Sequence, residues 1–237
     1  MFGRVVLKRG GKAEGESPFW ISFSDLMSAL MVLFLVVMAV TLISVTKDVS
    51  SAERKKIRRE QDIQALMAEI RQDSIEFPEV KVGGAPTYKI DLGDVVHFDS
   101  GSSVISPSGA AFLRKYVPVL LKVQATPRGQ KWIRRIVVEG FTDQDGTYLY
   151  NLGLSLNRSK SVVCVLFSRP AGNEQPLSEQ QKRQIQNLFL VGGYSFNSMK
   201  ASKEASRRVE LKLDFWGVDE DRDVNTAILD TKEIGQC

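Results

Sequence analysis

The sequence is poor in the side chains that most often carry catalysis or bind metals. Its 237 residues include one histidine, His97, and two cysteines, Cys164 and Cys237. A zinc site built on repeated Cys and His spacings needs more of both, and a hydrolytic triad with histidine would have to use His97. We therefore expect no enzyme activity, no cofactor and no metal site, with His97 as an ordinary strand residue.

An excess of one charge is also nearly absent. The chain has 32 Lys and Arg against 28 Asp and Glu, a formal net charge of +4. Nucleic-acid-binding proteins usually gather basic and aromatic residues on one face. The small excess predicts no direct binding to nucleic acid.

Charged residues are missing altogether from Leu26 to Thr46. At about 1.5 Å per residue, this helical run would be roughly 31 Å long, close to the hydrocarbon thickness of a bilayer. A cleaved signal peptide would have a shorter apolar core that ends in a small-x-small cleavage site, and no such site is evident. The pattern predicts one transmembrane helix over residues 19–46, with Trp20 as an interfacial anchor, after a short tail at residues 1–18.

Beyond the span, the chain divides into three further parts. Residues 47–80 are charged but carry apolar side chains at helical spacing, which predicts a linker helix. A solvated helix is favoured there over a tight coiled-coil pair, and Pro78, Gly83, Gly84 and Pro86 mark its end. Residues 81–216 are expected to form a folded domain, and residues 217–237 a polar C-terminal tail.

The domain pattern alternates short apolar runs with longer helical periods. We predict strands at 88–92, 95–98, 134–141, 188–196 and 207–215. A helix is expected from the Ser106 cap and Pro107 to about Val123, and a second over 147–168 with Leu152, Leu156, Val162, Val163 and Leu166 inward. The order β-α-β-α-β-β predicts an α/β fold with helices packed on a mixed sheet.

Asp25 stands directly before the uncharged run. An ionisable group at the edge of a bilayer is costly to place there, so it often has a function. A carboxyl group that takes up and releases a proton is a candidate ion carrier. A helix N-cap at the membrane interface is the alternative, and the physical argument alone leaves both open.

The segment Trp20-Ile21-Ser22-Phe23-Ser24-Asp25-Leu26-Met27-Ser28-Ala29-Leu30-Met31 resembles the membrane helix of MotB-like stator subunits. In that family the matching aspartate binds the translocated ion, so the resemblance implies this role for Asp25. Flagellar members usually have a lysine between the tryptophan and the isoleucine. Here Trp20 and Ile21 are adjacent, a departure from the flagellar pattern.

A second motif comprises Gly140-x-Thr142-Asp143, Asn151-x-x-Leu154-Ser155 and Arg158. It resembles the peptidoglycan-binding motif of OmpA-like domains, in which the matching aspartate and arginine hold the diaminopimelate of a stem peptide. A carboxylate and a guanidinium suit that zwitterion, and the planar guanidinium suits a carboxylate. Taken singly, Asp143 would be read as a turn residue and Arg158 as a solvated helix charge.

The resemblance implies further ligand contacts and a topology. Thr142, Asn151 and Leu154 complete the motif, and Arg208 matches a terminal Asn-Arg-Arg-Val strand in which Ser206 replaces the asparagine. Peptidoglycan lies outside the cytoplasmic membrane, so residues 47–237 are expected in the periplasm and the N-terminus in the cytoplasm. Four basic residues precede the span and six follow it by Arg59. That count slightly favours the opposite orientation of the span, but the expected folded domain outside the membrane outweighs it.

Together the two motifs imply a stator subunit of the bacterial inner membrane. One helix cannot enclose an ion path, so a MotA-like multi-span partner is implied, as five copies around a homodimer of this chain, with H⁺ rather than Na⁺ translocated. Within the class the chain resembles the B subunits of Zorya anti-phage defence systems. A flagellar MotB-type stator subunit and a passive OmpA-like wall tether remain the alternatives. Cys164 and Cys237 could pair, or Cys164 could be a buried free thiol.

Overall fold

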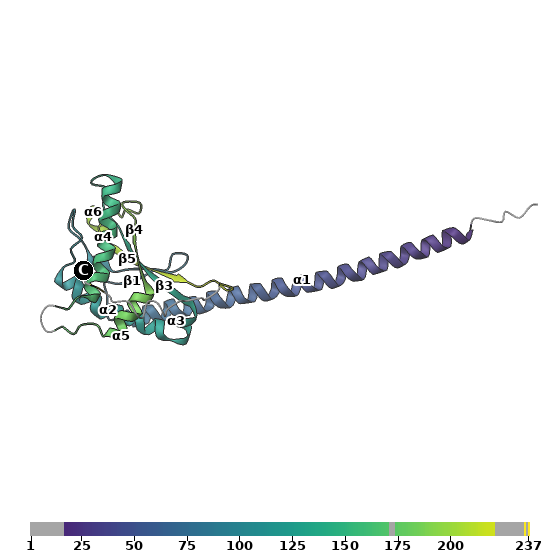
Figure 1. The fold of residues 1–237 in the computed structure, drawn as a ribbon, viewed down its shortest axis with the longest axis horizontal. Helices are drawn as coiled ribbons and strands as arrows, with labels where there is room; N and C mark the ends of the chain where they lie inside the picture. The colour runs from purple at the N-terminus through teal and green to yellow at the C-terminus, as the bar shows by residue number, and fades with distance from the viewer. Residues whose placement is uncertain (1–16, 171–173, 221–234, 236) are drawn as a thin grey trace, which may run out of the picture. The chain divides into compact units, whose positions relative to one another are not determined.

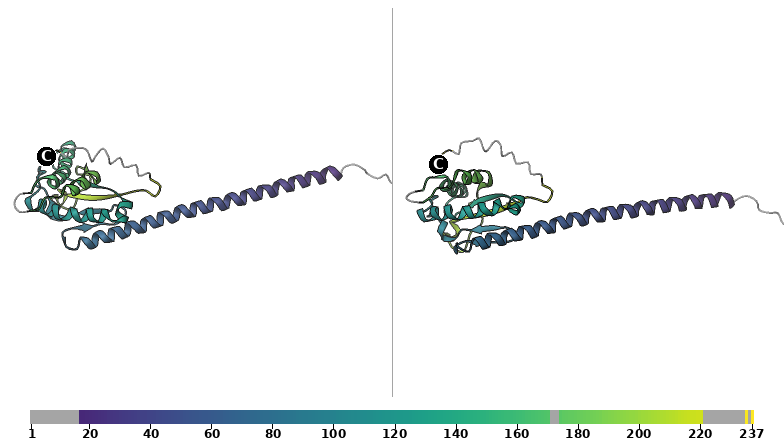
Figure 2. Two further views of the ribbon diagram at one scale, coloured as in Figure 1. Left: turned by 60° about the horizontal axis from the view of Figure 1, so that its bottom comes forward. Right: turned by 90° about the horizontal axis from the view of Figure 1, so that it is seen from below.

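The computed structural model describes residues 17–170, 174–220, 235 and 237. Residues 1–16 of the predicted tail at 1–18 and most of the tail at 217–237 lie outside the described residues, whereas residues 17 and 18 are helical. The chain forms two compact units, residues 1–55 and residues 56–237. One helix, α1 (Ser17–Asp73), supplies the described part of the first unit and also enters the second (Figures 1 and 2).

The first unit confirms a helix long and apolar enough to cross a membrane. The most apolar window of α1 has a mean hydropathy of 2.8, and its large side chains are exposed all round. Three hydroxyls of the run, those of Ser28, Thr41 and Thr46, donate to carbonyls of the helix itself. Ser28 donates to the Ser24 carbonyl at 2.8 Å and Thr46 to the Leu42 carbonyl at 2.7 Å. Such bonds satisfy polar groups where no water is at hand.

The last turns of α1, which belong to the second unit, differ from the solvated linker helix that the sequence predicts. Ile63, Leu66, Met67 and Ile70 of α1 are at most 1% exposed and belong to the hydrophobic core. Their spacing of three and four residues places them on one face of the helix. Burial of this face stabilises the domain in proportion to the apolar area removed from water. The expectation of a solvated helix is therefore wrong from Ile63 to Ile70, where α1 is part of the α/β domain, whereas residues 51–62 are mostly exposed.

Polar contacts fix the same part of α1 at its edges. Arg59 donates through Nε to the Trp216 carbonyl at 2.7 Å. The Tyr88 hydroxyl donates to Glu60 and Trp132 Nε1 donates to Asp62, both at 2.8 Å. The hydrogen bonds from Gln64 and then Tyr88 hold the pKa of Glu60 below its ordinary value. These bonds and the buried face together hold the helix against the domain.

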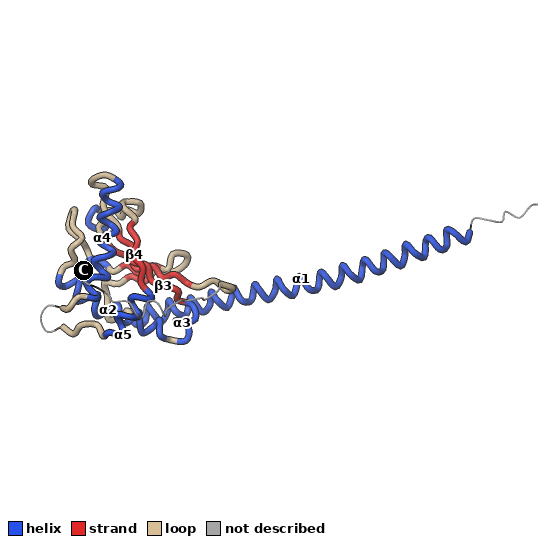
Figure 3. Tube along the Cα trace, viewed as in Figure 1, coloured by secondary structure: helices blue, strands red, loops and turns tan. Residues whose placement is uncertain are grey.

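The sheet of the domain is mixed, as predicted. Its strands are β1 (Lys81–Val82), β2 (Lys89–Asp91), β3 (Ile133–Gly140), β4 (Phe189–Gly193) and β5 (Val209–Phe215), in the order β1-β2-β5-β3-β4. β3 and β4 are parallel and the other pairs are antiparallel. The helices beside them in Figure 3 include α2 (Pro107–Ala125), α3 (Pro127–Trp132), α4 (Tyr148–Phe167) and α5 (Glu179–Leu188), and a short helix α6 spans Lys203–Ser206.

Local sequence signals explain most of these boundaries. The Ser106 hydroxyl caps α2 by accepting from the Gly109 amide at 3.1 Å, as predicted. The predicted strand at 95–98 is wrong, because Gly93–Val96 form a 3₁₀ turn η1 that Gly93 begins at a φ of +65°. His97 then makes a single bridge to Arg208 rather than a strand.

Helix α4 packs closely on β3 and β4. A Cβ at Gly140 would collide with the Ser155 carbonyl oxygen, and one at Gly193 would lie 2.8 Å from the Leu156 amide nitrogen. Val162 and Leu166 face the core as predicted, but Leu156 is 45% exposed and the expectation for it is wrong. The close contact with glycine is what brings the N-terminal end of α4 beside the end of β3.

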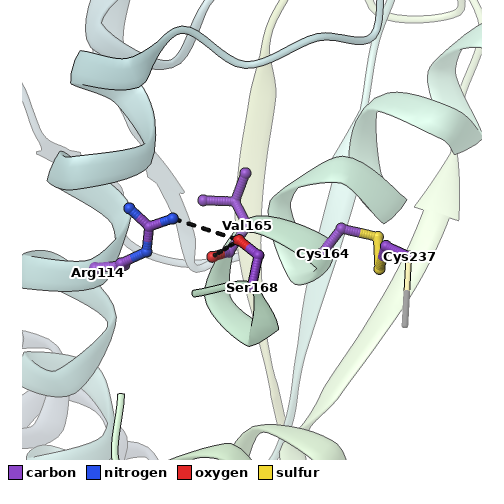
Figure 4. Close-up of a disulfide and its surroundings, with 5 residues drawn as sticks. All are labelled: Arg114, Cys164, Val165, Ser168 and Cys237. Carbon is purple, nitrogen blue, oxygen red and sulfur yellow. Dashed lines mark hydrogen bonds between the residues drawn. A yellow bond between two sulfur atoms is a disulfide. The ribbon is translucent and has the colours of Figure 1, made fainter. Parts of the chain in front are cut away.

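A disulfide joins Cys164 in α4 to Cys237, with 5.8 Å between the Cα atoms (Figure 4). The two cysteines therefore pair, and Cys164 is not a buried free thiol, which was the other possibility that the sequence left open. On the other side of α4, Arg114 of α2 donates to the Ser168 hydroxyl at 3.4 Å, and that hydroxyl donates to the Val165 carbonyl at 3.0 Å. The end of α4 is therefore held by a covalent bond and by hydrogen bonds.

Alternate residues of the central strands face away from the helices and carry charge. Glu139 of β3 and Glu210 of β5 are directly opposite each other in the register, and both are at least 95% buried. Lys89 lies between them, 2.7 Å from Glu139 and 3.2 Å from Glu210. Like charges at facing positions are unfavourable without such a cation.

Arg208 completes this buried network. Its Nε donates to Glu210 at 2.7 Å, Nη1 donates to the Ser198 carbonyl at 3.1 Å, and its guanidinium lies 4.2 Å from the centre of the Phe141 ring. Burial by itself raises the pKa of Glu210. Arg208 and then Lys89 outweigh that effect and hold the pKa below its ordinary value of 4.5.

The buried face of α1 predicts a clear difference between two substitutions. Leu66→Ala should lower the free energy of unfolding by about 2–5 kcal/mol, because it leaves a cavity in the core. Ile57→Ala, on an exposed turn of the same helix, should change it by less than about 0.5 kcal/mol. Chemical denaturation of the purified chain measures both, and equal effects would show that α1 does not pack in the core.

The charged network predicts the acid sensitivity of the fold. Ionised Glu210 has a lower pKa in the folded than in the unfolded chain, so it stabilises the fold above pH 4.5, and this contribution disappears as the pH falls below that value. Glu210→Gln should therefore lose less in melting temperature than the wild type between about pH 6 and about pH 3.5. Asp214→Asn, which removes a partly exposed pair with Arg135, is the control and should behave like the wild type.

Candidate functional site

Asp25 lies inside α1 rather than at its end. The helix begins at Ser17, so the reading of Asp25 as a helix N-cap is wrong. Its side chain is exposed and makes no hydrogen bond or ion pair with any residue that the structure describes. Ser28, Ala29 and Val32 follow at helical spacing and share its side of the helix. The carboxyl group is thus available to an ion or to a partner.

The loop between β3 and α4 carries the start of the second motif. Asp143 accepts from the Asp145 amide at 3.1 Å, and the Asn151 side chain donates to the Asp145 carbonyl at 2.9 Å. Gly146 closes the loop with a φ of +98°, which favours glycine. Asn151 is 1% exposed, so in this structure it shapes the loop.

Thr142 is buried in the same loop with an unsatisfied hydroxyl. Its amide donates to the Ser195 carbonyl at 2.9 Å, but its Oγ1 has no hydrogen-bond partner among the described residues. A buried polar atom without a partner is unfavourable by about 1–3 kcal/mol. This atom is therefore a candidate contact for a ligand.

Asp143 is paired with Arg207 rather than with Arg158. The Arg207 Nη1 donates to Oδ2 of Asp143 at 3.0 Å, and its Nε donates to the Phe98 carbonyl at 3.0 Å. The hydrogen bond to Asp143 raises the pKa of Arg207 above its ordinary value. A second pair, Lys203 with Asp145 at 2.7 Å, joins the same loop to α6. Sequence reasoning chose Arg208 from the Arg-Arg pair and missed Arg207, because the spacing does not show which neighbour reaches the loop.

Arg158 occupies the interior beneath the site. It is fully buried, and its three nitrogens donate to the carbonyls of Ser102 at 2.9 Å, Phe141 at 2.8 Å and Asp99 at 3.0 Å. Burial, the largest effect, lowers its pKa to about 10, and Asp143 partly opposes that shift. Arg158 thus ties the loop at 99–102 to the end of β3. Its role as a ligand contact stays a prediction.

A cavity of about 360 Å³ lies beside Arg207. Its lining includes side chains of both signs, among them Asp91, Asp94, His97, Lys200, Arg207 and Arg208.

Of the predicted site residues, the structure brings Thr142, Asp143 and Asn151 together around one loop, with Arg158 below it. Leu154 is half-buried on α4, and Arg208 lies in the buried charged network with Glu210.

Comparison with known proteins finds similarities in both parts of the chain. A family model described as membrane MotB of the proton-channel complex MotA/MotB matches residues 7–53. The periplasmic domain of Helicobacter pylori MotB is similar with a TM-score of 0.43 and 16% identity, over 61% of this chain and 84% of that one. The cell wall anchor of the T6SS from Pseudomonas aeruginosa gives 0.42 and 21%, over 63% and 97%.

Two relatives match along almost the whole length. The Zorya protein ZorB of Escherichia coli (strain ATCC 8739) is 23% identical over 228 residues, which cover 89% of this chain and 93% of the relative. The Zorya protein ZorB of Escherichia coli O139:H28 (strain E24377A / ETEC) is 43% identical over 224 residues, which cover 94% of this chain and 91% of the relative. This chain therefore belongs to the family of the Zorya protein ZorB.

Proposed function

We propose that the chain is the ion-binding and wall-anchoring subunit of a stator-like membrane complex in Zorya anti-phage defence. Asp25 carries the translocated ion, and the α/β domain holds peptidoglycan. The observation that carries this proposal is the position of Asp25. It is inside α1, next to the uncharged run, and has no partner among the described residues. A carboxyl group so placed is unfavourable unless an ion or a partner uses it.

The ion path needs other helices. A single span cannot shield a carboxylate from lipid on all sides. We expect this partner to be a MotA-like multi-span subunit, because the family model that matches residues 7–53 describes the MotA/MotB complex. We propose five such subunits around two copies of this chain, with H⁺ as the ion.

The wall anchor uses the loop after β3. The Asp143–Arg207 pair offers both charges that a zwitterionic diaminopimelate stem peptide requires. The Thr142 hydroxyl has no hydrogen-bond partner in the described part of the chain, and the cavity beside Arg207 has charges of both signs. This anchor requires the domain to be periplasmic and the N-terminus cytoplasmic, in the bacterial inner membrane. The Cys164–Cys237 disulfide agrees with an oxidising compartment.

This function includes no catalysis by the chain. A passive wall tether is the competing function, since it would use the same domain without ion transport. The two differ only at Asp25, which a tether does not need. The family relationship favours the Zorya assignment over a flagellar stator.

Replacement of Asp25 tests the ion-carrying role. Asp25→Asn keeps the size of the side chain but removes its titratable proton, so ion flux and phage defence should fall to background at unchanged membrane levels of the protein. Asp48→Asn, a carboxyl change in α1 beyond the uncharged run, is the matched control and should keep both. Full defence in the Asp25→Asn strain would leave the passive tether as the function.

Replacement of Asp143 tests the anchor. Asp143→Asn should weaken co-sedimentation of the detergent-solubilised chain with purified sacculi by roughly tenfold or more, because a hydrogen bond to a charged group contributes about 1.5–3 kcal/mol. Arg207→Ala should act similarly. Asp214→Asn is the control, because Asp214 is in β5 and outside the loop that carries Asp143, and this variant should bind like the wild type. Unchanged sedimentation of both site variants would refute this grip.

A further inference from the structure

The stretch of α1 just beyond the uncharged run contains as much net charge as the whole chain. From Lys47 to Arg59 there are six basic and two acidic residues, a net charge of +4, which equals the formal net charge of all 237 residues. Basic residues beside a membrane span are normally found on its cytoplasmic side. In the proposed orientation this stretch is on the opposite side, so the topology of the span does not explain its charge.

Three of these basic residues form a stripe along one side of the helix. Lys47, Arg54 and Arg58 are seven and four residues apart, so they lie within about 40° of one another around the helix axis. All three side chains are exposed, and none of them makes a hydrogen bond or an ion pair with a residue that the structure describes. We call these three residues the basic stripe.

The basic stripe is on the other side of α1 from the buried face. The buried residues between Ile63 and Ile70 are centred about 150° away from the stripe around the helix axis. Arg59, in contrast, is on the side of the buried face, and its Nε donates to the Trp216 carbonyl at 2.7 Å. The α/β domain thus uses Arg59 and leaves the stripe exposed.

The basic stripe begins where the uncharged run ends. Lys47 directly follows Thr46, and Arg54 and Arg58 are about 12 and about 18 Å further along the helix than Thr46. Side chains of a helix lean toward its N-terminus, which is the membrane end of this stretch. The headgroup layer is roughly 5–7 Å deep, and its charge acts over a Debye length of about 8 Å. The stripe is therefore within electrostatic reach of the lipid headgroups.

We propose that the basic stripe binds the phosphate groups of anionic phospholipids at this end of the span. Clusters of Lys and Arg beside a transmembrane helix recognise anionic lipids, and the planar guanidinium suits the oxygens of a phosphate. An acidic protein surface is the competing partner. The position of Lys47 next to the uncharged run favours lipid, because this residue is at the depth of the headgroups.

The lipid contact would fix the depth of α1 in the membrane. Trp20 is the expected anchor at one end of the span, and the basic stripe would be the anchor at the other end. Together they would set the depth of Asp25. The inference requires only that α1 spans the membrane, so it does not depend on ion transport or on the wall anchor.

The lipids that stay bound to the full-length chain test the proposal. The chain is reconstituted in nanodiscs made of equal parts phosphatidylcholine and phosphatidylglycerol, released into mild detergent and analysed by native mass spectrometry. Phosphatidylglycerol should exceed phosphatidylcholine among the bound lipids by roughly fivefold or more, the effect of one basic side chain near an anionic surface. The double substitution of Arg54→Gln and Arg58→Gln should bring the ratio close to that of the bilayer.

Two further variants separate the stripe from total charge. Arg54→Lys combined with Arg58→Lys should keep most of the enrichment, because the attraction follows charge. Lys115→Gln combined with Lys160→Gln removes the same charge from exposed positions of α2 and α4 and should keep all of it.

Two results would overturn the proposal. One is a wild-type chain without enrichment, and the other is an Arg54→Gln, Arg58→Gln variant that keeps the wild-type ratio. If that variant then fails to assemble with its multi-span partner, the stripe binds an acidic protein surface instead. Circular dichroism of each variant verifies that it is folded.

Discussion

The candidate site depends on one buried cation. Arg158 has no exposed surface, and its guanidinium is held by the carbonyls of Asp99, Ser102 and Phe141. A charge in the interior is tolerated only when its hydrogen bonds are made, so these carbonyls must converge on it. That requirement fixes the loop at 99–102 against the end of β3. Asp143 comes two residues after Phe141, so the same contacts support the loop that carries it.

Helix α1 meets two different requirements along its length. Its apolar run has large side chains on every side, as lipid requires, and the hydroxyls of Ser28, Thr41 and Thr46 bond to the helix backbone. Its last turns are apolar on one side only, and that side is in the core of the domain. The change from one pattern to the other falls in the charged stretch between Lys47 and Arg59. One continuous helix can therefore serve both as membrane span and as core element.

Much of this was predictable from the sequence, where the signal was local. The uncharged run, the Ser106 cap and the apolar strand at 134–141 each specify their structure through neighbouring residues, and the structure confirms them. Contacts between residues that are far apart in the sequence could not be predicted. An amphipathic helix has the same pattern whether its apolar face meets a partner or the core of its own domain. Similarly, two adjacent arginines gave no indication that Arg207 pairs with Asp143 while Arg208 joins a different network.

The two aspartates at the centre of the proposed function differ in how their charge is balanced. Asp143 finds a guanidinium and a backbone amide within its own domain, so the wall site is electrostatically complete in a single chain. Asp25 has no such partner among the described residues of its unit. A carboxylate facing lipid is unfavourable by some kcal/mol, about 2.5–3.5 at the bilayer centre and less near the interface. Under the proposed function, a proton or the helices of a partner subunit balance this charge. The same argument explains why the proposed wall anchor can act in a single chain, whereas the proposed ion-binding role of α1 requires partner helices.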